Sequence, residues 1–381
     1  MDYPFNTGRT HSLSPLIKWA GGKEKELPHI VPAAPAFNRY FEPFVGGGAV
    51  YTTFDAPACF INDRSEELIA LYRAIQTQNE AFFAWLCLIG RAWDAMLSQA
   101  EMAGSFVSFY ERLRSENFSE KDVAPFVSSQ LTGDDSGPTS ALPEAFAWHR
   151  GFLRTELHKT LTRKLIRMRQ IESTKALMPQ TDILKNIETA YMGALYMYFR
   201  RLYNDDDLRR DDDGLSTALF VFIRNYAYSG MFRYNEKGKF NVPYGGLAYN
   251  HKRLDKKISY YHSPALRAHM EKTVVECLDF EDFLHKYPPR TDDFVFLDPP
   301  YDSEFSTYAR NEFTREDQQR LASYLLHECP ARWMLVIKQT PFIQSLYDHP
   351  GIRIQTFNKQ YLVSFMNRNN KRAEHLLITN Y

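Results

Sequence analysis

Residues 292–301 read DDFVFLDPPY, a short apolar run that passes directly into an acid, two prolines and a tyrosine. An apolar run of this length beside a turn signal is typical of a buried strand. It predicts a strand over 292–297 that delivers Asp298 to its carboxyl end. Proline fixes φ and has no N–H, so the following loop is stiff and presents hydrogen-bond acceptors. Further on, Thr314 can cap a helix that contains Leu321.

The first part of the chain carries the matching half of an α/β pattern. Residues 40–44 (YFEPF) predict a buried strand that runs into the glycines at 46–48, and residues 59–61 predict a second strand that ends at Asn62-Asp63. One face of a helix follows, marked by Leu68, Leu71, Tyr72 and Ile75. The order strand, glycine loop, helix, strand and acid is typical of the opening of a doubly wound α/β domain.

Strand patterns return near the C-terminus, at 333–337 and, on either side of a polar turn at 367–370, at 361–366 and 375–379. Between the two sets the pattern is mainly helical, with a polar stretch at 128–143. We therefore predict an α/β fold with a Rossmann-like sheet built from both ends of the chain. The predicted boundaries are 1–78 and 251–381 for the discontinuous domain and 79–250 for the inserted helical domain.

The glycine loop at 46–48 and Asp63 predict a nucleoside-containing ligand. Small residues at a strand-to-helix turn let a ligand approach the backbone closely, and an acid at the tip of the next strand can accept hydrogen bonds from ribose hydroxyls. The loop lacks GxGxxG spacing, and Gly22-Lys23 is followed by Glu24, which excludes a Walker A pattern. These features fit NAD as well as S-adenosylmethionine, and a tight turn explains the glycines taken alone.

The chemistry available at Asp298 distinguishes these ligands. The lone pair of an exocyclic amine is delocalised into its ring, so the amine is a poor nucleophile. A carboxylate that accepts one N–H and a carbonyl that accepts the other favour a pyramidal nitrogen, and Asp298 and Pro299 offer these two acceptors. Tyr301 offers a flat face for a base, worth roughly 1–3 kcal/mol of stacking. An Asp-Pro-Pro turn without a catalytic role is the simpler alternative.

Six segments of the chain resemble the Dam-type adenine-N6 DNA methyltransferases, in that family's order and over nearly the whole length. They are 15–23 (PLIKWAGGK), 41–50 (FEPFVGGGAV), 62–63 (ND), 233–245 (RYNEKGKFNVPYG), 294–301 (FVFLDPPY) and 375–381 (HLLITNY). The resemblance implies a methyltransferase-type Rossmann sheet with an inserted target-recognition domain, S-adenosylmethionine as methyl donor and double-stranded DNA as partner. Two features depart from the family: a longer insertion between Asp63 and Arg224, and Lys338-Gln339 before Thr-Pro-Phe.

The resemblance also assigns roles to individual residues. The catalytic loop would consist of Asp298, Pro299, Pro300 and Tyr301. The cofactor would be contacted by Trp19, Gly21, Gly22, Lys23, Glu42, Pro43, Phe44, Gly46, Gly47, Gly48, Asp63, Asp279, Phe280 and Asp298. Within this set, Lys23 would meet the methionine carboxylate or the polar end of the site, Asp63 the ribose and Asp279-Phe280 the adenine of the cofactor. The target adenine would have to leave the base stack to reach Tyr301.

Residues 224–249 are the predicted DNA-reading hairpin. The residues expected to contact DNA are Arg224, Asn225, Arg233, Tyr234, Asn235, Lys239 and Asn241. Cations hold phosphates, while amides and aromatic rings can reach bases. A core strand with a solvated turn at 236–238 is the alternative. The basic stretch 150–169 is predicted to be a helix that contacts phosphates or presents a solvated face.

Bulk composition bounds the remaining possibilities. Lys plus Arg and Asp plus Glu both number 46, so a DNA-binding surface must arise from local segregation of charge. The four cysteines lack zinc-like spacing, and the acidic residues at 205–207 and 211–213 are interpreted as a solvated loop, so no metal is predicted. No signal peptide or membrane-spanning run is found, which predicts a cytoplasmic, nucleoid-associated protein of bacteria or phage.

Other functions remain as alternatives. A cytosine-N4 DNA methyltransferase faces the same unreactive amine, and a catalytically silent DNA-binding module could keep the fold. An RNA or protein amide methyltransferase and a nicotinamide dehydrogenase fit the motifs less well. The family resemblance also suggests a cognate restriction endonuclease as a functional partner, whereas the sequence predicts neither the oligomeric state nor the DNA site.

Overall fold

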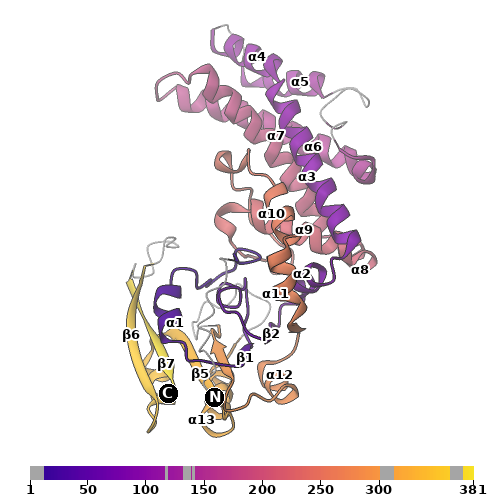
Figure 1. The fold of residues 1–381 in the computed structure, drawn as a ribbon. Helices are drawn as coiled ribbons and strands as arrows, with labels where there is room; N and C mark the ends of the chain where they lie inside the picture. Colours follow the sequence, from indigo (N-terminus) through magenta and orange to yellow (C-terminus); the bar gives the residue numbers. More distant parts are fainter. Residues whose placement is uncertain (1–12, 116–118, 132–138, 140–141, 301–312, 361–371) are drawn as a thin grey trace. The chain divides into compact units, whose positions relative to one another are not determined.

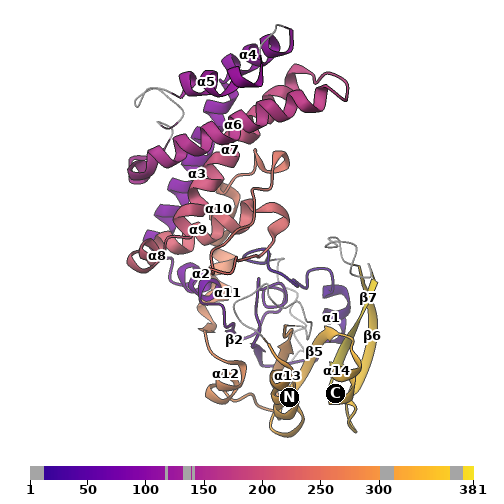
Figure 2. The same ribbon diagram turned by 180° about the vertical axis from the view of Figure 1, so that it is seen from behind.

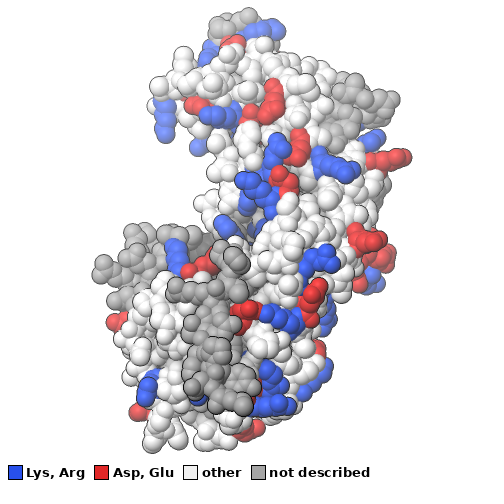
Figure 3. All heavy atoms as spheres, viewed as in Figure 1, with Lys and Arg blue, Asp and Glu red and all other residues white. Residues whose placement is uncertain are grey.

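The computed structural model describes residues 13–115, 119–131, 139, 142–300, 313–360 and 372–381. The predicted catalytic residue Tyr301 and the predicted strand at 361–366 lie outside these residues. The chain divides into two compact units, one of residues 1–77 with 261–381 and one of residues 78–260. Figures 1 and 2 show a unit with a sheet and a helical unit. Cations and anions are interspersed on the face in Figure 3, in keeping with the balanced composition.

The first unit contains a seven-stranded sheet in the order β3-β2-β1-β4-β5-β7-β6. Its strands are β1 (Arg39–Glu42), β2 (Ala58–Asn62), β3 (Thr273–Glu276), β4 (Phe294–Leu297), β5 (Arg332–Lys338), β6 (Arg353–Gln360) and β7 (Arg372–Thr379). The pairs among β3, β2, β1, β4 and β5 are parallel, and β7 is antiparallel to both β5 and β6. The prediction of one sheet built from both ends of the chain is therefore confirmed.

The pairing of the last strand differs from the prediction. A strand at 375–379 is confirmed as part of β7, and its partner in the hairpin is residues 353–357 of β6. The strand predicted at 361–366 lies outside the described residues. One edge of β7 bonds to β5 and the other to β6, with Ile354 opposite Ile378. The polar sequence of β6, RIQTFNKQ, gave no apolar run by which to predict it.

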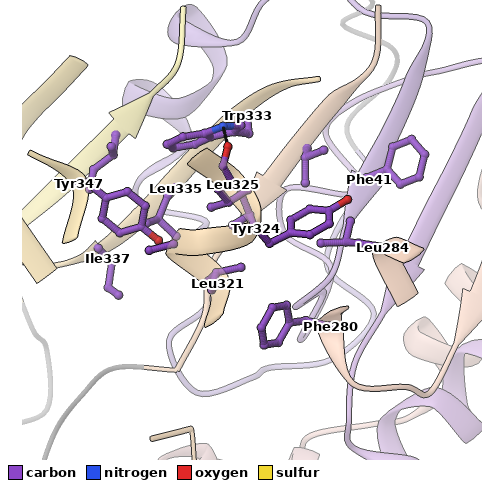
Figure 4. Close-up of a cluster of buried hydrophobic side chains, with 14 of the residues drawn as sticks. Phe41, Phe280, Leu284, Leu321, Tyr324, Leu325, Trp333, Leu335, Ile337 and Tyr347 are labelled. Atoms are coloured by element: carbon purple, nitrogen blue, oxygen red, sulfur yellow. Dashed lines mark hydrogen bonds between the residues drawn. The ribbon is translucent and has the colours of Figure 1, made fainter. Parts of the chain in front are cut away.

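Helices α12 (Phe280–Lys286), α13 (Arg315–His327) and α14 (Pro341–Tyr347) pack against the sheet. Their shared core joins strand residues such as Phe41, Leu335 and Ile337 to Phe280 of α12 and Leu321 of α13, as Figure 4 shows. Thr314 caps α13 as predicted, in a capping box with Asp317. Burial of each Leu or Phe here contributes about 1.5–3 kcal/mol, which fixes the strand ends on which the site lies.

The remaining helices of this unit are α1 (Leu27–Ala33), α2 (Glu66–Gln76) and α11 (Pro264–Glu271). Helix α2 is capped by Ser65 and buries Leu68, Leu71, Tyr72 and Ile75, so its predicted apolar face is confirmed. Tyr72 from this face donates a hydrogen bond to the Gly46 carbonyl at 3.1 Å. The helix therefore holds the glycine loop that precedes it in the chain.

The second unit is helical. It contains α3 (Glu80–Glu101), α4 (Gly104–Ser115), α5 (Glu120–Gln130), α6 (Arg150–Glu172), α7 (Gln180–Tyr203), α8 (Asp206–Asp211), α9 (Asp213–Tyr226) and, at its end, α10 (Asp255–Tyr261). Helix α3 is long and apolar enough to cross a membrane by length and composition alone. In the structure it packs on α7 and α9, with Trp93 only 1% exposed, so its apolar face is part of this unit's core.

The acidic stretch at 205–213 caps two helices. The Asp205 side chain accepts from backbone N–H groups at the start of α8, and Asp212 accepts from Leu215 at the start of α9. Carboxylates at helix N-termini satisfy N–H groups that have no partner within the helix. Within the described residues, His, Cys, Asp and Glu side chains form no group of three or more that could hold a metal ion.

Candidate active site

The glycine loop follows β1 at the carboxyl edge of the sheet. Gly46 and Gly48 have φ values of +49° and +81°, which L side chains rarely adopt. A Cβ at Gly46 would lie 2.8 Å from Cδ1 of Trp19, and one at Gly48 would lie 2.5 Å from the Tyr72 hydroxyl. The glycines are therefore needed by the protein's own packing, a reason the sequence did not reveal.

Asp63 holds this loop. Its Oδ2 accepts from the Gly46 N–H at 3.0 Å and its Oδ1 from the Ser65 N–H at 2.9 Å. Burial raises the pKa of the Asp63 carboxyl to about 6, although both hydrogen bonds oppose the shift. Each carboxylate oxygen has a second lone pair, so Asp63 retains acceptor capacity for ligand hydroxyls.

Asn62 is a site residue whose role the sequence did not predict. Its Nδ2 donates to the carbonyls of Pro43 at 3.1 Å and Leu278 at 3.0 Å, and its Oδ1 accepts from the Leu278 N–H at 2.8 Å. The side chain is 1% exposed. It thus ties together the loops that follow β1, β2 and β3. An amide at the last position of an apolar strand was the available signal.

Lys23 forms an ion pair with Asp298, which joins the N-terminal motif to the end of β4. Its Nζ also donates to the Gly21 carbonyl at 3.0 Å, and the side chain is 2% exposed. Nearby Glu42 is equally buried and accepts from the Tyr40 hydroxyl at 2.6 Å. Burial raises the pKa of Glu42 well above its usual value; the charge of Asp298 raises it further, while Lys23 opposes the shift.

The predicted adenine-contacting pair lies after β3. Asp279 caps α12 by accepting from Glu281 N–H at 3.1 Å, and it also pairs with Arg320 at 2.8 Å. The Phe280 ring is 1% exposed and lies 5.7 Å from the ring of Phe44. Phe280 is thus a core residue that supports Phe44.

The structure brings the segments of the predicted cofactor site together through direct contacts. The Leu16 N–H donates to the Gly47 carbonyl at 2.9 Å, and Trp19 lies against Gly46. Arg64, directly after Asp63, lies 3.8 Å from Asp279. Loop ends from β1, β2, β3 and β4 thus meet beside the 16–23 segment.

The predicted DNA-reading segment lies in the helical unit and forms a hairpin from Ala227 to Tyr244. Antiparallel bridges join Ala227 to Tyr244 and Tyr234 to Phe240. The Asn235 N–H donates to the Lys239 carbonyl at 2.9 Å across a turn in which Gly238 has a φ of +67°. Exposed Arg233 donates through Nε to Oδ1 of Asn241 at 2.8 Å, which leaves these side chains at the surface.

Two residues predicted for this hairpin lie elsewhere. Arg224 and Asn225 belong to the last turn of α9. Arg224 is 2% exposed, its guanidinium lies 3.6 Å from the centre of the Phe232 ring, and it donates to the Gly230 carbonyl at 3.3 Å. A contact between Arg224 and a DNA phosphate therefore does not fit this burial. Arg224 instead anchors the start of the hairpin to the helix.

The hairpin is also anchored at its other strand. The Lys239 ammonium donates to the Asn204 carbonyl at 2.6 Å and pairs with Asp206 at 2.5 Å. The hydroxyls of Tyr234 and Tyr203 lie 3.1 Å apart. Predicted DNA contacts thus sit on the C-terminal end of α7, which fixes their positions before any ligand binds.

A mostly parallel seven-stranded sheet, with a glycine loop after β1, an acid after β2 and Asp-Pro-Pro after β4, defines an enzyme of the methyltransferase fold class. The family profile of the D12 class N6 adenine-specific DNA methyltransferases matches residues 19–126 and 158–365. The chain belongs to this family, and its reaction is methylation of adenine N6 in DNA.

Several proteins with assigned names are similar over most of the chain. The Retron Ec67 DNA adenine methylase of Escherichia coli is 25% identical over 340 residues, which cover 88% of this chain and 81% of that protein. Type II methyltransferase M.MjaIII of Methanocaldococcus jannaschii is 24% identical over 97% of this chain and 99% of its own length. The DNA adenine methylase of Vibrio cholerae is 28% identical, with coverages of 81% and 74%.

Proposed function

We propose that the chain methylates adenine N6 at a specific site in duplex DNA, with S-adenosylmethionine as donor and with Asp298 and the Pro299 carbonyl as acceptors for the target amine. The Lys23–Asp298 ion pair beside the glycine loop carries this proposal, because it puts the acid of the Asp-Pro-Pro motif next to the predicted cofactor residues. S-adenosylmethionine supplies an electrophilic methyl group on a positively charged sulfur.

The chemistry of the site fits this donor. The Asp63 carboxylate has remaining lone pairs for ribose hydroxyls, and the ammonium of Lys23 is of the charge that a methionine carboxylate requires. Lys23 is now paired with Asp298, so a second carboxylate would compete for it. We infer that Lys23 serves both carboxylates and so links donor binding to the charge on Asp298.

Asp298 and Pro299 act on the nucleophile. The partly exposed carboxylate of Asp298 accepts one N–H of the amine, and the Pro299 carbonyl accepts the other. These two bonds draw the nitrogen lone pair out of conjugation and direct it toward the methyl group. Because a stacked base cannot reach the end of β4, the target adenine flips out of the duplex at a cost of a few kcal/mol. Tyr301 is proposed to stack on the flipped base.

DNA recognition is assigned to the helical unit, with residues 79–250 proposed as the inserted target-recognition domain. Arg233, Asn235 and Asn241 at the exposed hairpin are proposed to contact phosphates and base edges, with Tyr234 and Lys239 holding them in place. The names of type II relatives favour a restriction endonuclease of the same specificity as functional partner. We place the protein in the cytoplasm with the DNA it methylates.

The test of the proposed chemistry is Asp298→Asn, which keeps the volume and removes one acceptor. We expect turnover to fall by at least about 100-fold, the scale of losing one group that stabilises a transition state. S-adenosylmethionine affinity should not fall, because Lys23 loses the carboxylate that competes with the methionine carboxylate. The matched control is Asp292→Asn, an exposed position just before the opposite end of β4, which should keep full activity.

The readout is mass-spectrometric nucleoside analysis of methylated DNA. The expected result is N6-methyladenine from wild type and at least about 100-fold slower formation of it by Asp298→Asn. Full activity in Asp298→Asn would remove the proposed role of this carboxylate, and N4-methylcytosine in place of N6-methyladenine would favour the cytosine alternative.

A further inference from the structure

We propose that Gln318 is a positioning residue for the loop Asp298–Pro300. Its Nε2 donates to the Pro300 carbonyl at 2.9 Å, and its side chain is 0% exposed. It belongs to α13 and was not among the residues predicted to form the site. This inference rests on the proposed function of Asp298 and Pro299 as the acceptors of the target amine.

Packing alone does not explain a glutamine at this position. Gln318 shares the buried face of α13 with Leu321, Ala322 and Leu325. An amide on such a face gives up its hydrogen bonds to water, and an apolar side chain of similar volume would fill the space without that loss. The Oε1 atom has no hydrogen-bond partner among the described residues. The hydrogen bond from Nε2 to the Pro300 carbonyl is therefore the contact that compensates for burying the amide.

Pro299 and Pro300 have no N–H, so hydrogen-bond donors that hold this loop must come from other segments of the chain. Two side chains supply one at either end: Lys23 at Asp298 and Gln318 at Pro300. The Pro299 carbonyl lies between these two points, so its direction depends on both. Gln318 is itself well fixed, because its N–H donates to Thr314 at 3.1 Å in the capped first turn of α13.

The first test is Gln318→Met, which keeps the length and apolar packing of the side chain but removes the donor. We expect kcat to fall by roughly 10- to 100-fold, the effect of a small displacement of a reacting group. KM for S-adenosylmethionine and for DNA should stay within about twofold, because the loop is proposed to act on the amine and not to hold either substrate in the ground state.

The second test is Gln318→Glu, whose carboxyl can donate to the Pro300 carbonyl only while protonated. Burial should raise the pKa of the introduced carboxyl above its usual value. The titration is followed between about pH 8.5 and 5.5. We expect kcat relative to wild type to rise as pH falls. The ion pairs on the two elements that Gln318 joins, Lys23–Asp298 and Arg320–Asp317, are common to both proteins, so this ratio isolates the introduced group.

The neighbouring exposed residue provides the control: Gln319→Met and Gln319→Glu should keep wild-type kcat at each pH. Wild-type kcat in Gln318→Met, a ratio for Gln318→Glu that does not change with pH, or equal damage to kcat and cofactor affinity would each overturn the positioning role. If Gln318→Met fails to fold, the pH profile of Gln318→Glu decides. An active Asp298→Asn would contradict the proposed function instead, so the two failures are distinguishable.

Discussion

Asp63, at the end of a strand, accepts hydrogen bonds from the protein's own loops and also lies in the predicted cofactor site. Its carboxylate accepts two backbone N–H groups, and one of these belongs to Gly46 in the glycine loop. Asn62 beside it accepts or donates three more hydrogen bonds to backbone groups. Removing such a buried group leaves its partners unsatisfied, which costs about 1–3 kcal/mol. The geometry of the site therefore depends on Asp63 and Asn62, which hold the loops that follow the strands.

The raised pKa of Asp63 predicts a pH dependence of cofactor binding. A protonated carboxyl loses an acceptor for Gly46 or for a ribose hydroxyl, so affinity for S-adenosylmethionine should fall as pH drops below about 6. The limit is about tenfold for each pH unit. Equilibrium binding between pH 7.5 and 5 measures the effect. Asp63→Asn should bind weakly without this dependence, and a flat wild-type profile would contradict the prediction.

Stability should change in the opposite direction. The folded pKa of about 6 lies above the ordinary value of 3.8, so the folded chain holds this proton more tightly. The contribution of Asp63 to the free energy of unfolding therefore rises as pH falls through 6 toward 4. Affinity and stability that fall together over this range would point to another titrating group.

Substitutions at two glycines distinguish the cost of backbone strain from the cost of overpacking. Gly46 and Gly21 both have positive φ, but only at Gly46 would a Cβ meet another residue, the rigid indole of Trp19. We expect Gly21→Ala to cost about 1 kcal/mol of unfolding free energy, the price of a left-handed L residue. Gly46→Ala should cost about 2–3 kcal/mol, because overpacking adds to the strain. Urea unfolding measures both values, and equal costs would show that Trp19 moves aside.

At the scale of elements, helix ends decide which predicted DNA contacts reach the surface. Helix α9 continues through Tyr226, which buries Arg224 in the last turn, and the hairpin begins only at Ala227. The C-terminal end of α7 then supports the hairpin through Asn204 and Tyr203. This arrangement presents Arg233 on a backbone that is already ordered, so binding loses little conformational entropy.

Arg233→Ala should weaken DNA binding without affecting the cofactor site. Loss of one phosphate contact predicts a decrease of about 1 in the slope of log affinity against log salt. Fluorescence anisotropy with a duplex at several salt concentrations measures this slope. The control is Lys185→Ala, an exposed cation near the opposite end of α7. An equal loss of S-adenosylmethionine affinity in Arg233→Ala would indicate general damage to the fold.

At the scale of the whole molecule, each of the two compact units has a buried tryptophan among its own residues. Trp93 in the helical unit donates to the Asn250 carbonyl at 3.1 Å and packs on Tyr226. Trp333 in the sheet unit donates to the Leu325 carbonyl at 3.1 Å and packs on Tyr347. Each tryptophan is essentially buried within its own unit. Compact units that each have a buried core of their own can unfold in separate transitions.

This separation predicts opposite outcomes for two matched substitutions. Trp93→Ala should remove about 3–5 kcal/mol from the helical unit, with DNA binding lost at a temperature where S-adenosylmethionine still binds. Trp333→Ala should have the reverse effect. Calorimetry with and without each ligand measures the two transitions. A single transition that shifts equally in both variants would show that the units unfold as one.

The sequence by itself determined the family, the α/β class and the strands that carry the site. It could do so because short apolar runs beside Gly, Asp and Pro report on local backbone preferences. The tertiary structure decided what only distant contacts can reveal: the pairing of β7 with polar β6, the burial of Arg224, and the hydrogen bonds of Asn62 and Gln318 to loop carbonyls. Such contacts join residues far apart in the chain, and no local pattern encodes which backbone group a buried amide will meet.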